Sequence, residues 1–266
     1  GEVYLKPGEL APYYGATADG LQLPTNFNLL WTPWRAAAIE DMVEAYEAAL
    51  PKGAWPNWVL GNHDQSRIAT RLGKHQARVA MMLLLTLRGT PILYYGDELG
   101  LEDMRIPQDR IRDPFGLNMP GMGQGRDPQR CPMPWDETEK AGFTAGEPWL
   151  PVGTDKPGQS VEAQRGDRGS MLSLTRELLR LRRREAALSR GDWSRVKVEG
   201  EVLAYARSFG KMRFVIVLNL EARPKSVRFP APAIGRIALS THGHRKAERV
   251  RQCLELAANE GVVIAA

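Results

Sequence analysis

The stretch WVLGNHDQSR (Trp58–Arg67) joins an apolar run to three consecutive hydrogen-bonding side chains. The apolar run predicts a short buried strand, and Gly61 ends it. Asn62, His63 and Asp64 follow at once. Polar groups gathered where a buried strand ends are typical of the functional edge of a parallel α/β sheet or barrel. The same residues could also simply cap a strand end, and spacing alone does not separate the two interpretations.

Carboxylates accompany two other strand-like runs. Glu2 stands at the head of the β-prone run Glu2–Leu5. Asp97 and Glu98 lie at the exit of a longer run, TPILYYGDELG (Thr90–Gly100). Since parallel barrels place function at the carboxyl ends of their strands, these groups are expected at one edge. Two carboxylates from different strands are the minimum equipment for glycoside hydrolysis.

Helical segments alternate with these runs. The segment Ala36–Leu50 carries apolar residues at helical spacing, and His75–Leu87 is apolar nearly all round, as in a helix buried between a sheet and its neighbours. A further strand is predicted over NFNLLW (Asn26–Trp31). This alternation of strands and helices predicts a parallel α/β sheet.

The pattern changes in the second half of the chain. Residues from about Leu101 to Arg168 are rich in Gly, Pro, Asp and Arg and show little periodicity. The segment Arg168–Ala187 predicts an amphipathic helix with a solvated basic face. From Trp193 onward, short β-prone runs predict a small antiparallel domain. We therefore expect two domains, residues 1–190 and 191–266.

Composition is that of an ordinary globular protein: 266 residues, 43% hydrophobic and 25% charged. The sequence has no run of eighteen apolar residues, so no membrane-spanning helix is predicted. Cys131 and Cys253 are expected as free thiols in a reducing compartment, which favours a cytoplasmic location. The four histidines form no metal-ligand cluster, so no metal or cofactor is predicted. The net charge of +5 comes largely from a helix face and a basic tail, so no nucleic-acid partner is predicted.

Four motifs, in the right order, resemble the C-terminal half of an α-glucosidase of the α-amylase superfamily (glycoside hydrolase family 13). They are GEVYL (Gly1–Leu5), GNHDQSRIATRLG (Gly61–Gly73), GTPILYYGDELGLED (Gly89–Asp103) and GRDPQRCPMPWD (Gly125–Asp136). The likeness is greatest to exo-acting bacterial α-glucosidases and oligo-1,6-glucosidases. It implies strands five to eight of a (β/α)8 barrel followed by a small antiparallel β domain, and it covers essentially the whole chain.

The resemblance also implies roles for individual residues. Glu2 matches the general acid/base, and Asp64 matches the third catalytic carboxylate, which holds hydroxyls of the sugar being cleaved. His63 matches a histidine that hydrogen-bonds the same ring. Arg130 matches an arginine at the closed end of the glucose pocket, although Arg126 lies nearby as an alternative. To act as an acid near neutral pH, Glu2 would need a pKa raised by burial or by a neighbouring carboxylate.

Other polar residues near the motifs are expected to serve the structure. Tyr94, Tyr95, Asp97 and Glu98 are interpreted as strand-end packing and loop anchors. Arg67 is interpreted as an ion-pair partner near the pocket rather than as a substrate ligand.

The chain departs from the family pattern in two places. No motif resembling GFRxD, which carries the family's nucleophilic aspartate, occurs in the sequence. The chain opens with Gly1 rather than Met, which we interpret as a break just before the acid. In the loop where the family shows RTPMQWD, this chain has Cys131 and Pro134. Proline removes a backbone donor from the loop that carries Arg130.

These observations favour part of a retaining, exo-acting α-glucosidase that releases glucose from short α-linked oligosaccharides. Without the nucleophile, the chain is expected to be inactive alone, since retention needs two carboxyl groups roughly 5 Å apart. The alternatives are an inert fragment or pseudoenzyme that acts only by association, and a transglucosylating relative such as a sucrose isomerase or trehalose synthase. A half barrel exposes two open sheet edges, so we expect self-association or binding to a missing half.

Overall fold

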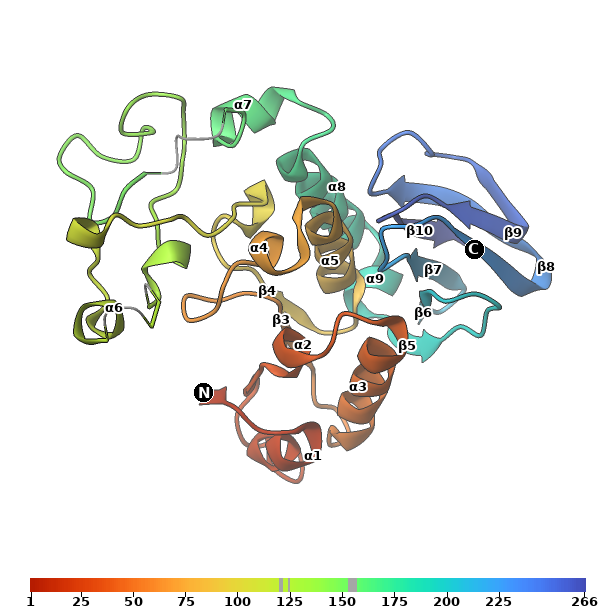
Figure 1. The fold of residues 1–266 in the computed structure, drawn as a ribbon. Coiled ribbons are helices and arrows are strands. Elements are labelled where there is room, and N and C mark those ends of the chain that lie inside the picture. The colour runs from red at the N-terminus through yellow and green to blue at the C-terminus, as the bar shows by residue number, and fades with distance from the viewer. Residues whose placement is uncertain (120–121, 124, 153–156) are drawn as a thin grey trace. The chain divides into compact units, whose positions relative to one another are not determined.

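The computed structural model describes residues 1–119, 122–123, 125–152 and 157–266 (Figure 1). The chain forms two compact units. The first comprises Gly1–Leu60, Arg78–Ile92 and Glu177–Ala266, and the second comprises Gly61–Ala77 and Leu93–Arg176.

Four short strands of the first unit form two parallel pairs. Strand β1 (Glu2–Val3) pairs with β2 (Thr25–Asn26), and β3 (Asn57–Val59) pairs with β4 (Thr90–Ile92). The Asn57 side chain links β2 to β3, because its Oδ1 accepts a hydrogen bond from the Asn26 amide at 2.9 Å. Parallel pairing of strands separated by helices is the α/β pattern that the sequence predicted.

The prediction of a strand over Asn26–Trp31 is correct only for Asn26, the last residue of β2. The chain turns there into the short helix α2 (Asn28–Trp31). Asn26 Oδ1 accepts a hydrogen bond from the Asn28 amide at 3.0 Å, which directs the backbone out of the strand. A short apolar run does not by itself distinguish a strand from a buried helical turn.

The longer helices agree with the predicted segments. Helix α3 (Ala36–Ala49) buries Ile39, Val43 and Tyr46. Helix α5 (Lys74–Thr86) is buried along most of its length. Two further α-helices of the first unit are short: α1 (Pro7–Leu10), which a 3-10 helix follows at Ala11–Tyr14, and α9 (Ala186–Arg190).

Helix α8 (Met171–Arg184) has the predicted apolar stripe, of which Leu178 and Leu181 are almost fully buried. The prediction of a solvated basic face is wrong at one position. Arg182 is 9% exposed and donates hydrogen bonds to the carbonyl oxygens of Leu85 at 2.9 Å and Leu87 at 3.0 Å. These carbonyls lie at the end of α5, so Arg182 caps that helix from inside the unit.

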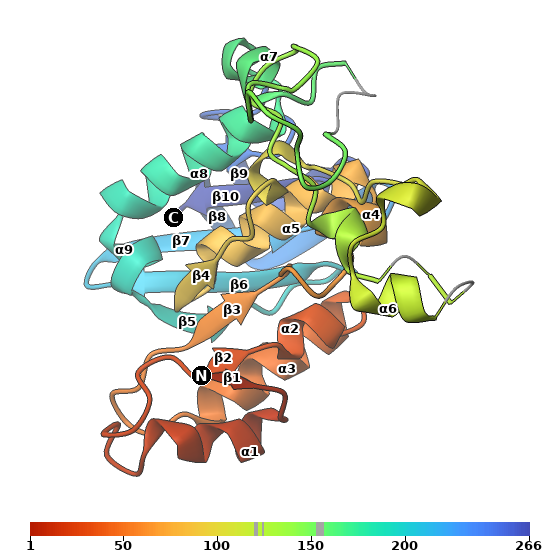
Figure 2. The ribbon, with the colours of Figure 1, turned by 90° about the vertical axis from the view of Figure 1, so that its left-hand side faces the viewer.

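A six-stranded antiparallel sheet follows, as predicted. Its strand order is β5-β6-β7-β10-β8-β9, and α9 lies against β6 and β7 (Figure 2). The strands are β5 (Asp192–Arg195), β6 (Leu203–Phe209), β7 (Met212–Leu218), β8 (Lys225–Ser240), β9 (Arg249–Leu256) and β10 (Gly261–Ala265). Alternate residues of these strands form one apolar core that includes Val217, Phe229 and Val262. The domain boundary between residues 190 and 191 stays a prediction.

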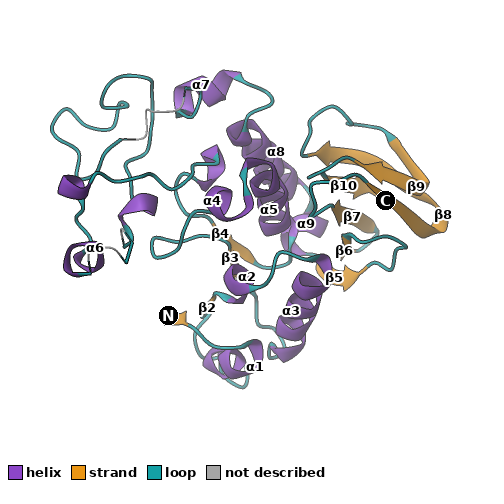
Figure 3. Cartoon of the chain, viewed as in Figure 1, coloured by secondary structure: helices purple, strands orange, loops and turns teal. Residues whose placement is uncertain are grey.

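The second unit consists mainly of loops between short helices (Figure 3). The α-helices that lie wholly within its described residues are α4 (Ile68–Leu72), α6 (Pro114–Asn118) and α7 (Val161–Gly166), and short 3-10 helices occur at Asp97–Leu99, Gln108–Arg110 and Asp127–Gln129. The predicted irregular stretch from 101 to 168 is therefore mostly confirmed, while its residues 120–121, 124 and 153–156 lie outside the described part. Two small apolar clusters support these loops, one around Leu99 and Met133 and the other around Ile106 and Leu150.

Cys131 is buried, Cys253 is exposed, and both are free thiols, as predicted. In the described part of the chain, no group of three or more His, Cys, Asp or Glu side chains is arranged to hold a metal ion. None of the helices formed by the described residues combines the length and apolar character that crossing a bilayer requires.

Candidate functional site

The His63–Asp64 motif occupies the loop after β3, where the sequence predicted it. Asn62 Oδ1 accepts a hydrogen bond from the Asp64 amide at 3.0 Å, which closes an Asx turn. The turn brings His63 Nε2 to 3.4 Å from Asp64 Oδ1. The His63 side chain is 49% exposed and that of Asp64 is 26% exposed, so both remain accessible to a ligand.

Two arginines converge on Asp64. Arg130 Nη2 lies 2.9 Å from Asp64 Oδ1, and Arg130 Nε donates to the His63 carbonyl oxygen at 2.9 Å. Arg126 Nη1 lies 3.4 Å from the same Asp64 oxygen. The second unit thus brings together His63, Asp64 and Arg130, and Arg126 joins them rather than replacing Arg130. Asp64 Oδ2 takes part in none of these contacts.

A buried carboxylate anchors Arg126. Asp113 Oδ2 accepts hydrogen bonds from Arg126 Nε and from the Arg126 amide, both at 2.7 Å. Asp113 Oδ1 caps helix α6 by accepting from the Phe115 amide at 3.0 Å. The hydrogen bonds from Arg126 hold the pKa of Asp113 well below its usual range. Sequence reasoning missed Asp113, although Asp before Pro114 is an N-cap signal that could have found it.

Arg67 is the ion-pair partner that the sequence predicted. Its side chain is almost fully buried, with Nη1 4.0 Å from Asp97 Oδ1. The guanidinium donates to the carbonyl oxygens of Tyr95 at 2.7 Å and Gln129 at 2.9 Å. It also lies 5.1 Å from the ring centre of Tyr94 and 5.0 Å from that of Tyr95. Arg67 therefore ties the loop after β4 to the loop that carries Arg130.

Asp97 is buried directly beneath the motif loop. Burial raises its pKa to about 7, and the nearby Arg67 opposes that shift. A side chain at Gly61 would place its Cβ 2.9 Å from Asp97 Oδ2, so the buried Asp97 carboxylate would have to shift to admit any other residue. This close approach explains why a glycine separates the strand from the motif.

The loop carrying Arg130 is fixed through three successive carbonyl groups. The carbonyl oxygens of residues 129–131 accept hydrogen bonds from Tyr94 OH at 3.2 Å, Trp149 Nε1 at 3.1 Å and Tyr95 OH at 2.7 Å. The loop is therefore well supported although it has Cys131 and Pro134 where the family pattern differs. Burial raises the pKa of the Cys131 thiol to about 12, which keeps it protonated.

Glu2 belongs to the first unit. It is the first residue of β1, pairs in register with Thr25, and is exposed. The described residues therefore leave this side chain open to solvent. The roles of Glu2, His63, Asp64 and Arg130 stay predictions.

The arrangement in the second unit has a clear chemical capacity. A partly exposed carboxylate offers acceptors, while a histidine and two guanidinium groups offer donors. Such a set suits a neutral ligand rich in hydroxyl groups, because each hydroxyl is both donor and acceptor. The Asp64 carboxylate can also stabilise a positive charge that develops on a bound ring.

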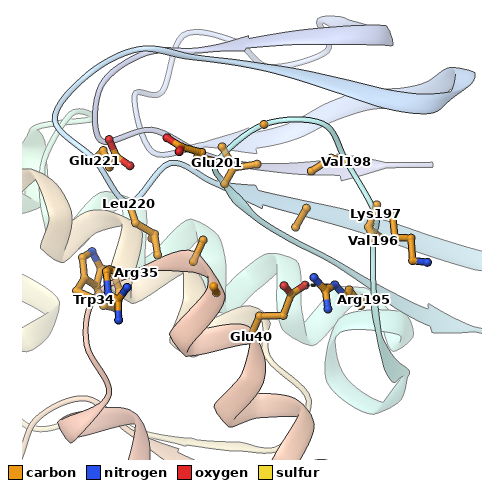
Figure 4. A pocket seen from close by; sticks show the side chains of 15 residues that line it. Trp34, Arg35, Glu40, Arg195, Val196, Lys197, Val198, Glu201, Leu220 and Glu221 are labelled. Carbon is orange, nitrogen blue, oxygen red and sulfur yellow. Dashed lines mark ion pairs between the residues drawn. The ribbon is translucent and has the colours of Figure 1, made fainter.

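A cavity of about 640 Å³ lies in the first unit, and none of the predicted site residues lines it. Figure 4 shows its lining, with Trp34 and Arg35 at one end and Lys197 at the other. Glu40 and Arg195 in this cavity form an ion pair at 2.8 Å.

Comparison with known proteins identifies the family of the chain. The family model "Alpha amylase, catalytic domain" matches residues 13–191. Maltase A1 of Drosophila melanogaster is 34% identical over 236 residues, which are 85% of this chain and 41% of the maltase. The human amino acid transporter heavy chain SLC3A1 is 31% identical over 80% of this chain and 31% of its own length.

A solved structure gives the same result in three dimensions. The crystal structure of an alpha-glucosyl transfer enzyme, XgtA, superposes with a TM-score of 0.86 and 30% identity, and covers 100% of this chain and 50% of that enzyme. The chain thus spans half or less of the length of these relatives. The predicted fold class, half of a (β/α)8 barrel followed by an antiparallel β domain, is confirmed. The chain belongs to the alpha-amylase family, and its similarity to a maltase confirms the resemblance to α-glucosidases.

Proposed function

We propose that the chain supplies the sugar-binding part of a retaining, exo-acting α-glucosidase that releases glucose from short α-linked oligosaccharides. The observation that carries this proposal is the convergence of Arg130 and His63 on Asp64 at the end of β3. Similarity to a maltase supports the substrate class.

Each residue of the cluster has a role in this proposal. Asp64 accepts hydrogen bonds from two hydroxyls of the terminal glucose and favours its distorted, oxocarbenium-like state. His63 donates to the same ring. Arg130 closes the pocket and fixes the Asp64 carboxylate, and Arg126 assists from the other side.

Hydrolysis requires more than this cluster. Glu2 would act as the acid that protonates the leaving oxygen, and a second carboxylate would attack the sugar. The sequence contains no motif resembling GFRxD. We therefore expect this chain to bind α-glucosides without turning them over.

Binding of the glucose-shaped iminosugar deoxynojirimycin, measured by titration calorimetry, tests the sugar site. The chain is expected to bind it, and Asp64→Asn to bind at least about tenfold more weakly, because the variant loses the charge that pairs with the cationic ring nitrogen. The matched control is Asp109→Asn, at an exposed aspartate of the same unit, which should bind as the unchanged chain does. Equal binding by the chain and by Asp64→Asn would refute the assignment.

Release of nitrophenol from an aryl α-glucoside tests the expected inactivity. The chain and its Glu2→Gln variant should both give only the background rate. Activity that disappears in Glu2→Gln would mean that another source supplies the nucleophile, and it would contradict inactivity while supporting the role of Glu2.

Glucosyl transfer is a second candidate, supported by the similarity to the alpha-glucosyl transfer enzyme XgtA. If any turnover occurs, the ratio of free glucose to nitrophenol in the presence of an acceptor sugar distinguishes the two reactions. A ratio near one indicates hydrolysis, and a much lower ratio indicates transfer.

A non-catalytic role in association is a third candidate, because SLC3A1 is named as a transporter heavy chain. Failure to bind deoxynojirimycin would favour it. The expected self-association, the expected binding to a missing half and the cytoplasmic location stay predictions. Light scattering that shows a stable, monodisperse monomer would contradict self-association.

A further inference from the structure

A second cavity, of about 330 Å³, lies in the second unit and has an aromatic lining. Tyr95, Trp135, Phe143 and Trp149 line it together with Met133, and Glu98 contributes the one carboxylate of the described lining. This volume is at the lower end of the range of ligand pockets, about 300–1,000 Å³. The cavity contains none of the residues proposed to hold the sugar.

The aromatic residues of this cavity are unusually accessible. Trp135 is 49% exposed and Trp149 is 54% exposed. Phe143 and Trp149 meet edge to face, with ring centres 5.0 Å apart and planes at 89°. The rings of Trp135 and Trp149 are large and accessible to solvent, so beside this cavity they form an apolar surface that a ligand can cover.

The polar atoms of two of these aromatic side chains are already engaged. Trp149 Nε1 donates to the Arg130 carbonyl oxygen, and Tyr95 OH donates to the Cys131 carbonyl oxygen. What Trp149 and Tyr95 offer a ligand is therefore chiefly ring surface. A ring surface carries a negative π face, which attracts cations.

Glu98 adds a fixed negative charge. Its Oε2 accepts a hydrogen bond from the Gly96 amide at 2.7 Å, which orients the carboxylate. Oε1 takes no part in that bond. The cavity thus combines aromatic surface with one carboxylate oriented by the backbone.

The chemistry of the lining discriminates among ligand classes. A sugar would leave most of its hydroxyls without partners, which costs free energy on burial. A neutral apolar molecule would remove water from Glu98 without compensating its charge. A quaternary ammonium ion avoids both costs, because it is apolar on its surface, needs no hydrogen bonds and carries the opposite charge.

We propose that this cavity is a binding site for a quaternary ammonium group, held by the rings of Trp135 and Trp149 and by the charge of Glu98. The side chains of this site differ from those proposed to hold the sugar, while Tyr95 and Trp149 also hold the loop that carries Arg130.

Calorimetric titration with choline, beside its neutral isostere in which carbon replaces the nitrogen, tests the proposal. Choline is expected to bind at least about tenfold more tightly than the isostere, because only choline gains the cation–π and carboxylate attraction. Equal affinity for the two compounds, or no binding of choline, would overturn the proposal.

Two variants locate the site. Glu98→Gln keeps an oxygen for the Gly96 amide and removes only the charge, so it should weaken choline binding about tenfold and leave the isostere unchanged. Trp135→Leu should weaken choline binding by a similar factor. The matched control is Trp31→Leu, which removes a tryptophan that is 57% exposed on α2, outside the cavity. Circular dichroism checks that each variant is folded. Choline binding that survives both Glu98→Gln and Trp135→Leu would place the site elsewhere.

Discussion

One guanidinium group, that of Arg130, contacts both residues of the motif after β3. Its Nη2 lies 2.9 Å from the Asp64 carboxylate, and its Nε donates to the His63 carbonyl oxygen at 2.9 Å. The planar guanidinium group of Arg130 thus holds the Asp64 side chain and the His63 backbone at the same time. The orientation of Asp64 depends on this double contact.

Replacing Arg130 by lysine should weaken binding of deoxynojirimycin about tenfold. A lysine ammonium keeps the charge but lacks the planar fork, so it does not reproduce both contacts. Arg105→Lys, at an exposed arginine of the same unit, is the control and should bind as the unchanged chain does. Undiminished affinity in Arg130→Lys would mean that charge alone holds Asp64.

Asp113→Asn should lower the free energy of unfolding by about 1 kcal/mol near neutral pH. Asparagine still caps α6 but loses the charge that binds Arg126, and the exposure of Arg126 keeps the effect small. Because the pKa of Asp113 is lowered by folding, its contribution is present above the unfolded pKa of about 4 and is lost as the pH falls through the folded value. Urea unfolding at several pH values measures this. A difference that grows as the pH falls would contradict it.

Asp97 should have the opposite pH dependence. Folding raises its pKa to about 7, so the folded chain binds a proton more tightly, and stability falls as the pH rises from about 4 to 7. The total loss is on the order of 4 kcal/mol. In Asp97→Asn this part of the pH dependence should disappear. If the stability of the chain and that of Asp97→Asn changed in parallel over this range, Asp97 would titrate outside this pH range.

Arg182→Met should destabilise the first unit by about 2–4 kcal/mol, because the buried carbonyl groups at the end of α5 lose their donors while the apolar stem is kept. Arg183→Met, at an exposed position of the same helix, should change stability by no more than about 0.5 kcal/mol. Thermal unfolding of the two variants side by side provides the measurement. Equal melting temperatures would mean that water replaces the Arg182 contacts.

Periodicity predicted the elements whose burial is set locally. Ile39, Val43 and Tyr46 recur on one face of α3 and are buried there, because a helix places such residues on one side. Periodicity gave a wrong prediction over Asn26–Trp31, where the hydrogen bond of one side chain directs the backbone. The Asn26 side chain binds the Asn28 amide and ends β2, and the apolar run alone carries no trace of that bond.

The candidate site was predictable to a similar extent. His63 and Asp64 are neighbours in sequence, so their proximity follows from the chain itself. Arg130 was placed by resemblance to the family. The joint contact of Arg126 with Asp64 and Asp113 depends on how the loops fold over one another, which neither periodicity nor spacing contains. The prediction that Arg182 is exposed failed for a related reason. The other arginines of α8 are exposed, whereas Arg182 contacts the end of α5.

The position of β10 in the sheet has a consequence for synthesis on the ribosome. This strand lies between β7 and β8, which precede it in the sequence, and it pairs antiparallel with both. While the chain emerges, β7 and β8 each keep one unpaired edge until residues 261–265 have left the exit tunnel. An unpaired edge is a template for pairing with other chains. Nascent or prematurely terminated chains should therefore depend on chaperones more strongly than the completed sheet does.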